Sequence, residues 1–173
     1  MFFSVRDLEV RKAHFDVAIS AGEIDYVEGL RQAGPLQAEG TAELLGNTLG
    51  EIRVKGRLKV AMEAECDRCL EKAVFPIDSE FDLFYRPADT GPSGDEVAIS
   101  DAESEIGFYA GGGVDLKEIL REYILLSMPM QRVCRESCLG MCPVCGQNRN
   151  VRACACSQQA VDDRWAALRN FKK

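Results

Sequence analysis

Six of the eight cysteines in this 173-residue chain lie between positions 134 and 156. Thiolate is a soft ligand, and four thiolates at short spacings are what Zn²⁺ takes in a closed structural site. The most specific segment is Cys142-Pro-Val-Cys145-Gly146, because two residues between the thiols let one tight turn present both to a single ion. Gly146 permits the left-handed backbone that closes such a turn. We therefore predict a structural zinc site here.

The thiols of this region outnumber the four that one zinc ion takes. The preferred ligands are Cys142, Cys145, Cys154 and Cys156, since the residues between Cys145 and Cys154 form a turn long enough to bring the chain back. Cys138 is the best substitute for one of these ligands, and Cys134 lies four residues before it. Iron–sulfur ligation uses the same chemistry and is the less favoured alternative.

A further thiol pair stands far upstream, at Cys66-Asp-Arg-Cys69, between two segments that read as strands. Cysteines three apart cannot both project from one face of a flat strand, so the backbone must turn between them. A redox pair is one interpretation, but such pairs usually open a helix, whose dipole lowers the thiol pKa. A hairpin tip that packs, or that donates to a metal, is favoured. If Cys66 and Cys69 join Cys134 and Cys138, the eight thiols make two four-thiolate sites.

The composition favours a soluble globular protein with reduced thiols. Hydrophobic residues make up 46% of the chain and charged residues 28%, and no apolar run approaches the roughly 20 residues of a membrane span. The first residues show no basic stretch followed by an apolar run, so we expect no signal peptide and a cytoplasmic location. In that compartment eight cysteines indicate metal ligands or thiols rather than a disulfide framework.

Charge is divided unequally along the chain. Residues 1–130 hold 13 Lys and Arg against 25 Asp and Glu, whereas residues 131–173 hold 8 against 3. A basic end on an acidic body suggests a polyanion as partner for that end, and Arg68, Arg149 and Arg152 are the candidate RNA contacts. The alternative is that the arginines merely offset the negative charge of a four-thiolate zinc site.

The chain offers little for catalysis. His14 is its one histidine, and it falls in a strand pattern where a surface position is expected. No glycine-rich phosphate loop and no nucleophile signature are present. We therefore expect neither an enzyme nor a small-molecule substrate.

Alternating apolar residues predict strands over about 15–19, 38–44, 52–64 and 75–85, with a loop or short helix around 22–34. The third strand carries a row of basic residues on its outer face, which invites an RNA-binding interpretation. A turn centred near Arg68 would instead place three of them opposite acidic residues, in the pairs Lys59 with Asp78, Arg57 with Glu80 and Lys55 with Asp82. Such cross-strand pairs mask the row, so we favour a structural role for it.

One helix is predicted over about 115–128, with Asp115 as its cap and Glu118 three residues on, as in a capping box. A short strand around Val97 and Ile99 and a short closing helix over 161–173 are also expected. The fold class is therefore α+β, an antiparallel sheet or partly open barrel packed by a helix. Residues 1–130 form the body, and residues 131–173 form a small cysteine-rich zinc-binding module.

Several motifs together resemble the bacterial YceD family. They are Cys66-Asp-Arg-Cys69-Leu-Glu, the helix that reaches Leu-Ser-Met-Pro129, the Cys-x₃-Cys-x-Gly-x-Cys-Pro-x-Cys-Gly-x-Asn segment and the closing Asp-Arg-Trp-Ala-Ala-Leu. Two positions depart from the family pattern, where leucine is usual at Arg149 and proline at Asp163, and neither is a metal ligand. Some members lack the cysteine-rich tail, which implies that the shared activity belongs to the body.

The resemblance implies a cytoplasmic, non-catalytic factor in assembly of the large ribosomal subunit. The partners it implies are ribosomal RNA, large-subunit ribosomal proteins or assembly intermediates. Two hypotheses follow for the direct contact. In the first, the basic tail binds ribosomal RNA. In the second, the acidic body is an adaptor that holds a basic ribosomal protein and does not touch RNA.

Overall fold

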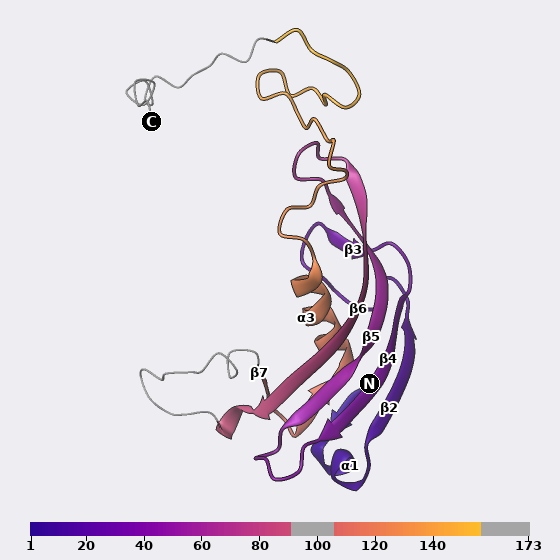
Figure 1. The fold of residues 1–173 in the computed structure, drawn as a ribbon, viewed down its shortest axis with the longest axis vertical. Coiled ribbons are helices and arrows are strands. Elements are labelled where there is room, and N and C mark those ends of the chain that lie inside the picture. The colour runs from indigo at the N-terminus through magenta and orange to yellow at the C-terminus, as the bar shows by residue number, and fades with distance from the viewer. Residues whose placement is uncertain (91–105, 157–173) are drawn as a thin grey trace, which may run out of the picture.

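The computed structural model describes residues 1–90 and 106–156 and confirms the α+β class, with a mostly antiparallel sheet (Figure 1). In chain order its elements are β1 (Phe2–Ser4), α1 (Val5–Val10), β2 (Ala13–Ile19), β3 (Leu30–Gln32), β4 (Leu36–Leu44), β5 (Ile52–Glu65), β6 (Lys72–Pro87), the 3₁₀ turn η1 (Ala88–Thr90), β7 (Ile106–Tyr109), β8 (Gly113–Asp115) and α3 (Leu116–Ser127).

The main sheet has the strand order β2-β4-β5-β6-β7, with β3 paired to β5. Its pairs are antiparallel except the last, because β7 runs parallel to the end of β6. The sequence predicted an antiparallel sheet, and the β6–β7 pair departs from that prediction. The long β5–β6 hairpin is the spine of the curved sheet, and its tip reaches the cysteine-rich end of the molecule (Figure 1).

The register predicted for the β5–β6 hairpin is confirmed. Opposite one another lie Lys55 and Asp82, Arg57 and Glu80, and Lys59 and Asp78. The ion pairs run partly on the diagonal: Arg57 Nε lies 2.8 Å from Asp78 Oδ1, and Arg53 Nη2 lies 2.5 Å from Asp82 Oδ2. The two guanidinium groups hold the pKa of each carboxyl below its usual range. Much of the basic row on this face is therefore already paired with carboxylates.

Helix α3 lies against the inner face of the sheet (Figure 1). Its buried residues join the core formed by the strands: Leu116, Ile119, Leu120 and Ile124. The Asp115 side chain caps the helix by accepting a hydrogen bond from the Lys117 N–H at 2.7 Å. Tyr123 donates its hydroxyl to the Glu80 carbonyl oxygen at 2.8 Å, which ties the helix to β6.

Besides the 3₁₀ turn η1, five short elements of the described residues were not predicted from the sequence. Strand β1 pairs with β8. Helix α1 follows β1 and is capped at its N-terminus by Ser4. Strand β3 lies inside the segment expected to be a loop or short helix. Strand β7 is the fifth. The strand expected around Val97 and Ile99 and the closing helix over 161–173 fall outside the described residues. In the two described ranges no helix is long and apolar enough to cross a membrane.

Candidate metal centres

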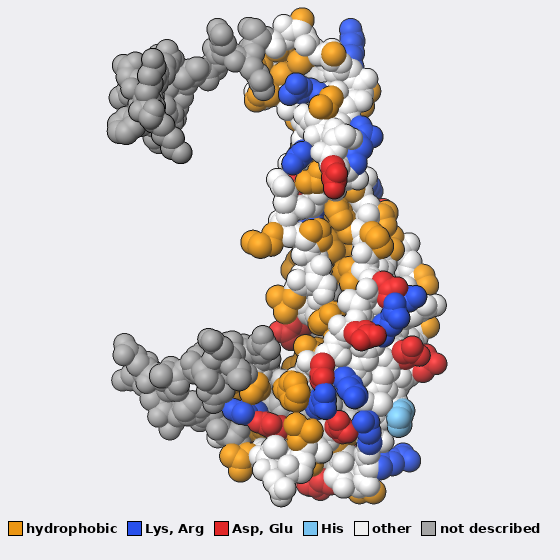
Figure 2. Space-filling view, viewed as in Figure 1, with side chains coloured by type: hydrophobic (Ala, Val, Ile, Leu, Met, Phe, Trp, Pro, Cys, Tyr) orange, Lys and Arg blue, Asp and Glu red, His pale blue; other side chains and the backbone are white. Residues whose placement is uncertain are grey.

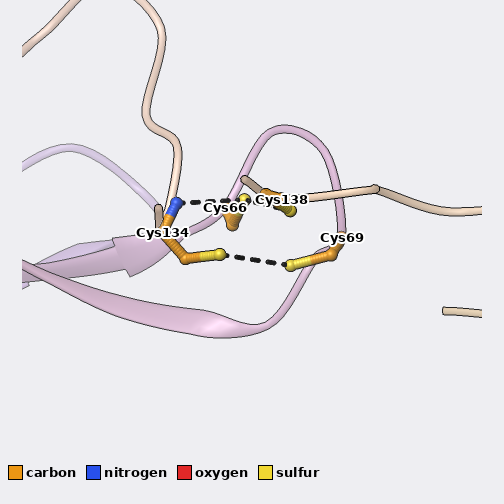
Figure 3. Close-up of side chains that lie close together, drawn as sticks. All are labelled: Cys66, Cys69, Cys134 and Cys138. Atoms are coloured by element: carbon orange, nitrogen blue, oxygen red, sulfur yellow. Dashed lines mark hydrogen bonds between the residues drawn. The ribbon is translucent and has the colours of Figure 1, made fainter. Parts of the chain in front are cut away.

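The turn at the tip of the β5–β6 hairpin presents two thiols from one side. The Cys66 N–H donates to the Glu71 carbonyl at 2.9 Å, and the Leu70 N–H donates to the Cys66 carbonyl at 2.9 Å. Leu70 adopts a positive φ of 61°, which residues other than glycine rarely do outside tight turns. These bonds close the turn, which brings the sulfurs of Cys66 and Cys69 close together (Figure 3).

The chain after α3 supplies two more thiols to the same place. Two hydrogen bonds dock this segment on the hairpin tip: the Asp67 N–H donates to the Arg132 carbonyl at 2.8 Å, and the Arg132 N–H donates to the Asp67 side chain at Oδ2 at 2.7 Å. Cys134 and Cys138 follow and turn their sulfurs toward Cys66 and Cys69 (Figure 3). We call these four cysteines the hairpin cluster.

The sulfur positions of the hairpin cluster match a tetrahedral metal site. The Sγ atoms of Cys66 and Cys138 are 3.9 Å apart, and those of Cys69 and Cys134 are 3.8 Å apart. A tetrahedral ion with metal–sulfur bonds of about 2.3 Å separates its ligand sulfurs by about 3.8 Å. A disulfide would require a separation of about 2.05 Å. The geometry therefore fits a four-thiolate ion and not a pair of disulfides.

The hydrogen bonds around the hairpin cluster favour thiolates. Burial raises the pKa of Cys66, but the backbone N–H groups of Cys134, Arg68 and Cys69 outweigh it and lower that pKa to about 6. Burial together with the neighbouring thiols raises the pKa of Cys134 to about 12. Four sulfurs this close cannot all ionise without a cation among them, because like charges disfavour each further ionisation. A divalent ion would supply that charge.

The last four cysteines form a second group, the tail cluster of Cys142, Cys145, Cys154 and Cys156. Their sulfurs lie within 4.8 Å of one another. The Cys142 N–H donates to the Gln147 carbonyl at 2.8 Å, and Gly146, at a φ of +71°, donates its N–H to the Cys142 carbonyl at 2.9 Å. This is the tight turn that the Cys-Pro-Val-Cys-Gly spacing predicts.

The tail cluster repeats the electrostatics of the first. Backbone N–H groups of Cys145 and Val144 lower the pKa of Cys142 to about 6. A hydrogen bond with Cys145, together with burial, raises the pKa of Cys156 to about 12. In each cluster, therefore, the pKa of one thiol is lowered and that of another is raised relative to an isolated cysteine.

The structure divides the candidate thiols in one definite way. It brings together the preferred set of Cys142, Cys145, Cys154 and Cys156, and it places Cys138 and Cys134 with Cys66 and Cys69. Cys138 thus lies in the hairpin cluster rather than substituting in the tail cluster. This is the two-site arrangement that counting the thiols left open, and either group could hold a metal ion.

The three candidate RNA contacts are all exposed, but they are not equivalent. Arg68, at the hairpin tip, donates from Nη1 to the Cys138 carbonyl at 3.4 Å, so it also braces the hairpin cluster. Arg149 and Arg152 extend from the loop of the tail cluster, and neither forms an ion pair with another described residue. Two residues of that loop were not predicted to matter, Asn148 and Asn150, and their side chains bridge the two clusters. The spacing of this asparagine-rich loop predicted only a turn.

Comparison with known proteins places the chain in a family. Residues 54–172 match the family model described as "Large ribosomal RNA subunit accumulation protein YceD". This span includes most of the β5–β6 hairpin, α3 and both thiol clusters. The chain therefore belongs to the YceD family.

Two chloroplastic relatives carry a similar description, and other relatives are uncharacterized. The chain is 30% identical over 60 residues to the chloroplastic YCED homolog 1 of Arabidopsis thaliana, a match that covers 35% of this chain and 19% of the relative. Identity to the Zea mays homolog 1 is 27% over 135 residues, covering 65% of this chain and 46% of that protein. An uncharacterized protein of Mycobacterium tuberculosis is 28% identical to this chain over 117 residues, a match that covers 68% of this chain and 54% of that protein. No solved structure matches.

Proposed function

We propose that this chain is a non-catalytic factor in biogenesis of the large ribosomal subunit, and that each thiol cluster holds a structural Zn²⁺. The ribosomal role is supported by the family description and by the chloroplastic relatives named for accumulation of the large ribosomal RNA subunit. The matches span about half or less of each of these relatives, so their full activity is carried over here only as a proposal. The cytoplasm, where thiols stay reduced, is the compartment this role implies.

The observation that carries the zinc part is the pair of four-thiol clusters. Thiolates are the ligands Zn²⁺ prefers in structural sites, and four of them leave no open position for substrate or water. Bound zinc would hold the chain after α3 on the hairpin tip and give the tail a defined shape. Its role would thus be structural, in keeping with a factor that binds rather than reacts.

We further propose that the tail end of the molecule contacts ribosomal RNA. Residues 131–156 include four arginines (Arg132, Arg135, Arg149 and Arg152) and one acidic residue, Glu136, and Arg132 pairs with Asp67 of the hairpin tip at 3.4 Å. Figure 2 shows Lys and Arg scattered over this end, whereas acidic and basic side chains alternate over the body. The basic row on the sheet is largely paired, so Arg149 and Arg152 of the tail loop are better placed for phosphate.

The RNA contact can be tested on the zinc-loaded full chain. Binding to large-subunit ribosomal RNA fragments should weaken as salt increases, because each neutralised phosphate releases counterions. Replacing Arg149 and Arg152 by Ala should weaken binding and reduce the slope of log K against log salt by about one for each phosphate that is no longer neutralised. The matched control replaces Lys55 and Arg57 on the sheet face and should bind like wild type. An equal loss of RNA affinity in both variants would show that Arg149 and Arg152 do not form the RNA-binding surface.

The second candidate is an adaptor that holds a basic ribosomal protein. A groove between α3 and the loop after β2 favours it, with Glu118 and Glu122 on the helix and Glu23 and Asp25 on the loop. Lys117 pairs with Glu23 at 2.9 Å, so part of this acidic lining is already neutralised. Nuclease treatment before a pull-down separates the two functions: an adaptor keeps its ribosomal protein, whereas an RNA-bound factor loses it.

A further inference from the structure

The loop of the tail cluster reaches across to the hairpin cluster through one side chain. Asn150 lies between Cys145 and Cys154 in the sequence, but its Nδ2 donates to Cys138 Sγ at 3.3 Å. Its Oδ1 accepts the N–H of Leu139 at 2.8 Å, and it also accepts a hydrogen bond from Arg135 Nη2 at 3.2 Å. Asn150, from the loop of one candidate metal site, therefore donates a hydrogen bond to Cys138, a candidate ligand of the other site.

Asn148 holds Asn150 in this position. The backbone N–H and the Nδ2 of Asn150 donate to Asn148 Oδ1 at 2.9 and 3.0 Å. Asn148 Nδ2 in turn donates to Glu71 Oε1 at 3.3 Å, which anchors it to the base of the hairpin turn. The orientation of the Asn150 amide is thus set by the tail loop and by the hairpin together.

Residues 139–141 form the linker between the two clusters, and hydrogen bonds hold this linker on both sides. Met141 donates its N–H to the Arg68 carbonyl at the hairpin tip at 2.8 Å, and Arg149 donates its N–H to the Gly140 carbonyl at 2.9 Å. Hairpin tip, linker and tail loop are therefore joined in series by hydrogen bonds. Displacement of the tail loop would release the linker and remove the hydrogen bond to Cys138.

We propose that the two thiolate sites form one coupled two-metal unit, in which Asn150 of the tail loop is a positioning residue for the hairpin cluster. The inference rests on the proposed function in one respect, that both clusters bind metal. An N–H aimed at sulfur stabilises the thiolate, and its removal weakens metal binding although the ligands remain. The loop that carries Asn150 runs between two ligands of the tail cluster, so metal there fixes its two ends. Linkage makes the coupling reciprocal: metal in either site raises the affinity of the other.

The test follows cadmium-113 resonances of the full chain, which distinguish the two sites, during competition with a chelator. Asn150→Ala should lower the metal affinity of the hairpin cluster about 10-fold or more, the usual effect of removing such a partner. The matched control is Val151→Ala, because Val151 is in the same loop, 80% exposed, and uses only its backbone. An Asn150→Ala chain with the same hairpin affinity as the control overturns the proposal.

A second variant separates thiolate solvation from simple loop packing. Asn150→Asp keeps an acceptor for the Leu139 N–H but turns a carboxylate toward Cys138 Sγ. Coupling through the thiolate predicts an affinity at least as low as that of Asn150→Ala, and an Asn150→Asp chain that binds like wild type contradicts it.

A double-mutant cycle tests the coupling itself. Replacing Cys154 and Cys156 by Ser disables the tail cluster and should lower hairpin affinity about 10-fold or more in wild type, but have little further effect in Asn150→Ala. Equal hairpin affinity with and without the tail ligands shows independent sites and overturns the inference alone. A wild-type chain that binds metal at neither cluster rejects the zinc proposal as well.

Discussion

Gly140 shows how the site depends on a single residue between the clusters. It has a φ of +68°, and a Cβ there would lie 2.9 Å from the Arg68 carbonyl oxygen. Ala can adopt neither the conformation nor the contact without strain, because left-handed backbone is costly for residues with a Cβ and backbone oxygen cannot move aside. The close approach of the linker to the hairpin tip therefore requires glycine.

We expect Gly140→Ala to destabilise the docked linker by about 1–3 kcal/mol. The measurement is amide hydrogen exchange at Met141, whose N–H donates to Arg68. The control, Gly111→Ala, has a similar φ of +74° but meets nothing within 4 Å and lies outside the tail. Exchange at Met141 that is equally slow in both variants would contradict the account.

At the scale of the element, α3 and the β5–β6 hairpin position the thiols. The helix is pinned to the sheet by its apolar face, and its end delivers the chain to the hairpin tip. Helix α3 contains both a buried and an exposed leucine, which allows a matched comparison: Leu120 has no exposed surface, while Leu126 is 79% exposed.

Leu120→Ala should lower the free energy of unfolding by about 2–5 kcal/mol, because it removes buried methyl groups and leaves a cavity. Leu126→Ala should change it by less than about 0.5 kcal/mol, as exposed substitutions usually do. Urea unfolding followed by circular dichroism measures both. Similar destabilisation in the two variants would show that α3 does not pack as described.

The same elements show what the sequence could and could not predict. The register of β5 and β6 was predictable, because a turn centred at Arg68 places apolar residues on one face and pairs basic with acidic residues on the other. The strands and helices of three to six residues were missed, since so short a stretch carries almost no periodicity. The assignment of Cys134 and Cys138 could only be left open, because Cys134 meets Cys69 across 65 residues through docking that no local spacing reveals.

At the scale of the whole molecule, the β5–β6 hairpin runs out of the curved sheet, and the cysteine-rich segment lies at its tip (Figure 1). The acidic body and the basic end are different surfaces, and the two proposed partners, RNA and a basic ribosomal protein, would each meet a different one. The apolar core belongs to the body and does not include the cysteines; those of the hairpin turn pack in a small cluster of their own with Val133. The body should therefore stay folded when metal is withdrawn, while the tail loses its order.

The most direct test of the two-zinc account is native mass spectrometry of the full chain, purified under reducing conditions, with a count of free thiols after denaturation in chelator. The account predicts two zinc ions per chain and eight reactive thiols once the metal is removed. A chain that carries no metal, that carries an iron–sulfur cluster, or that has cysteines joined as disulfides would contradict it.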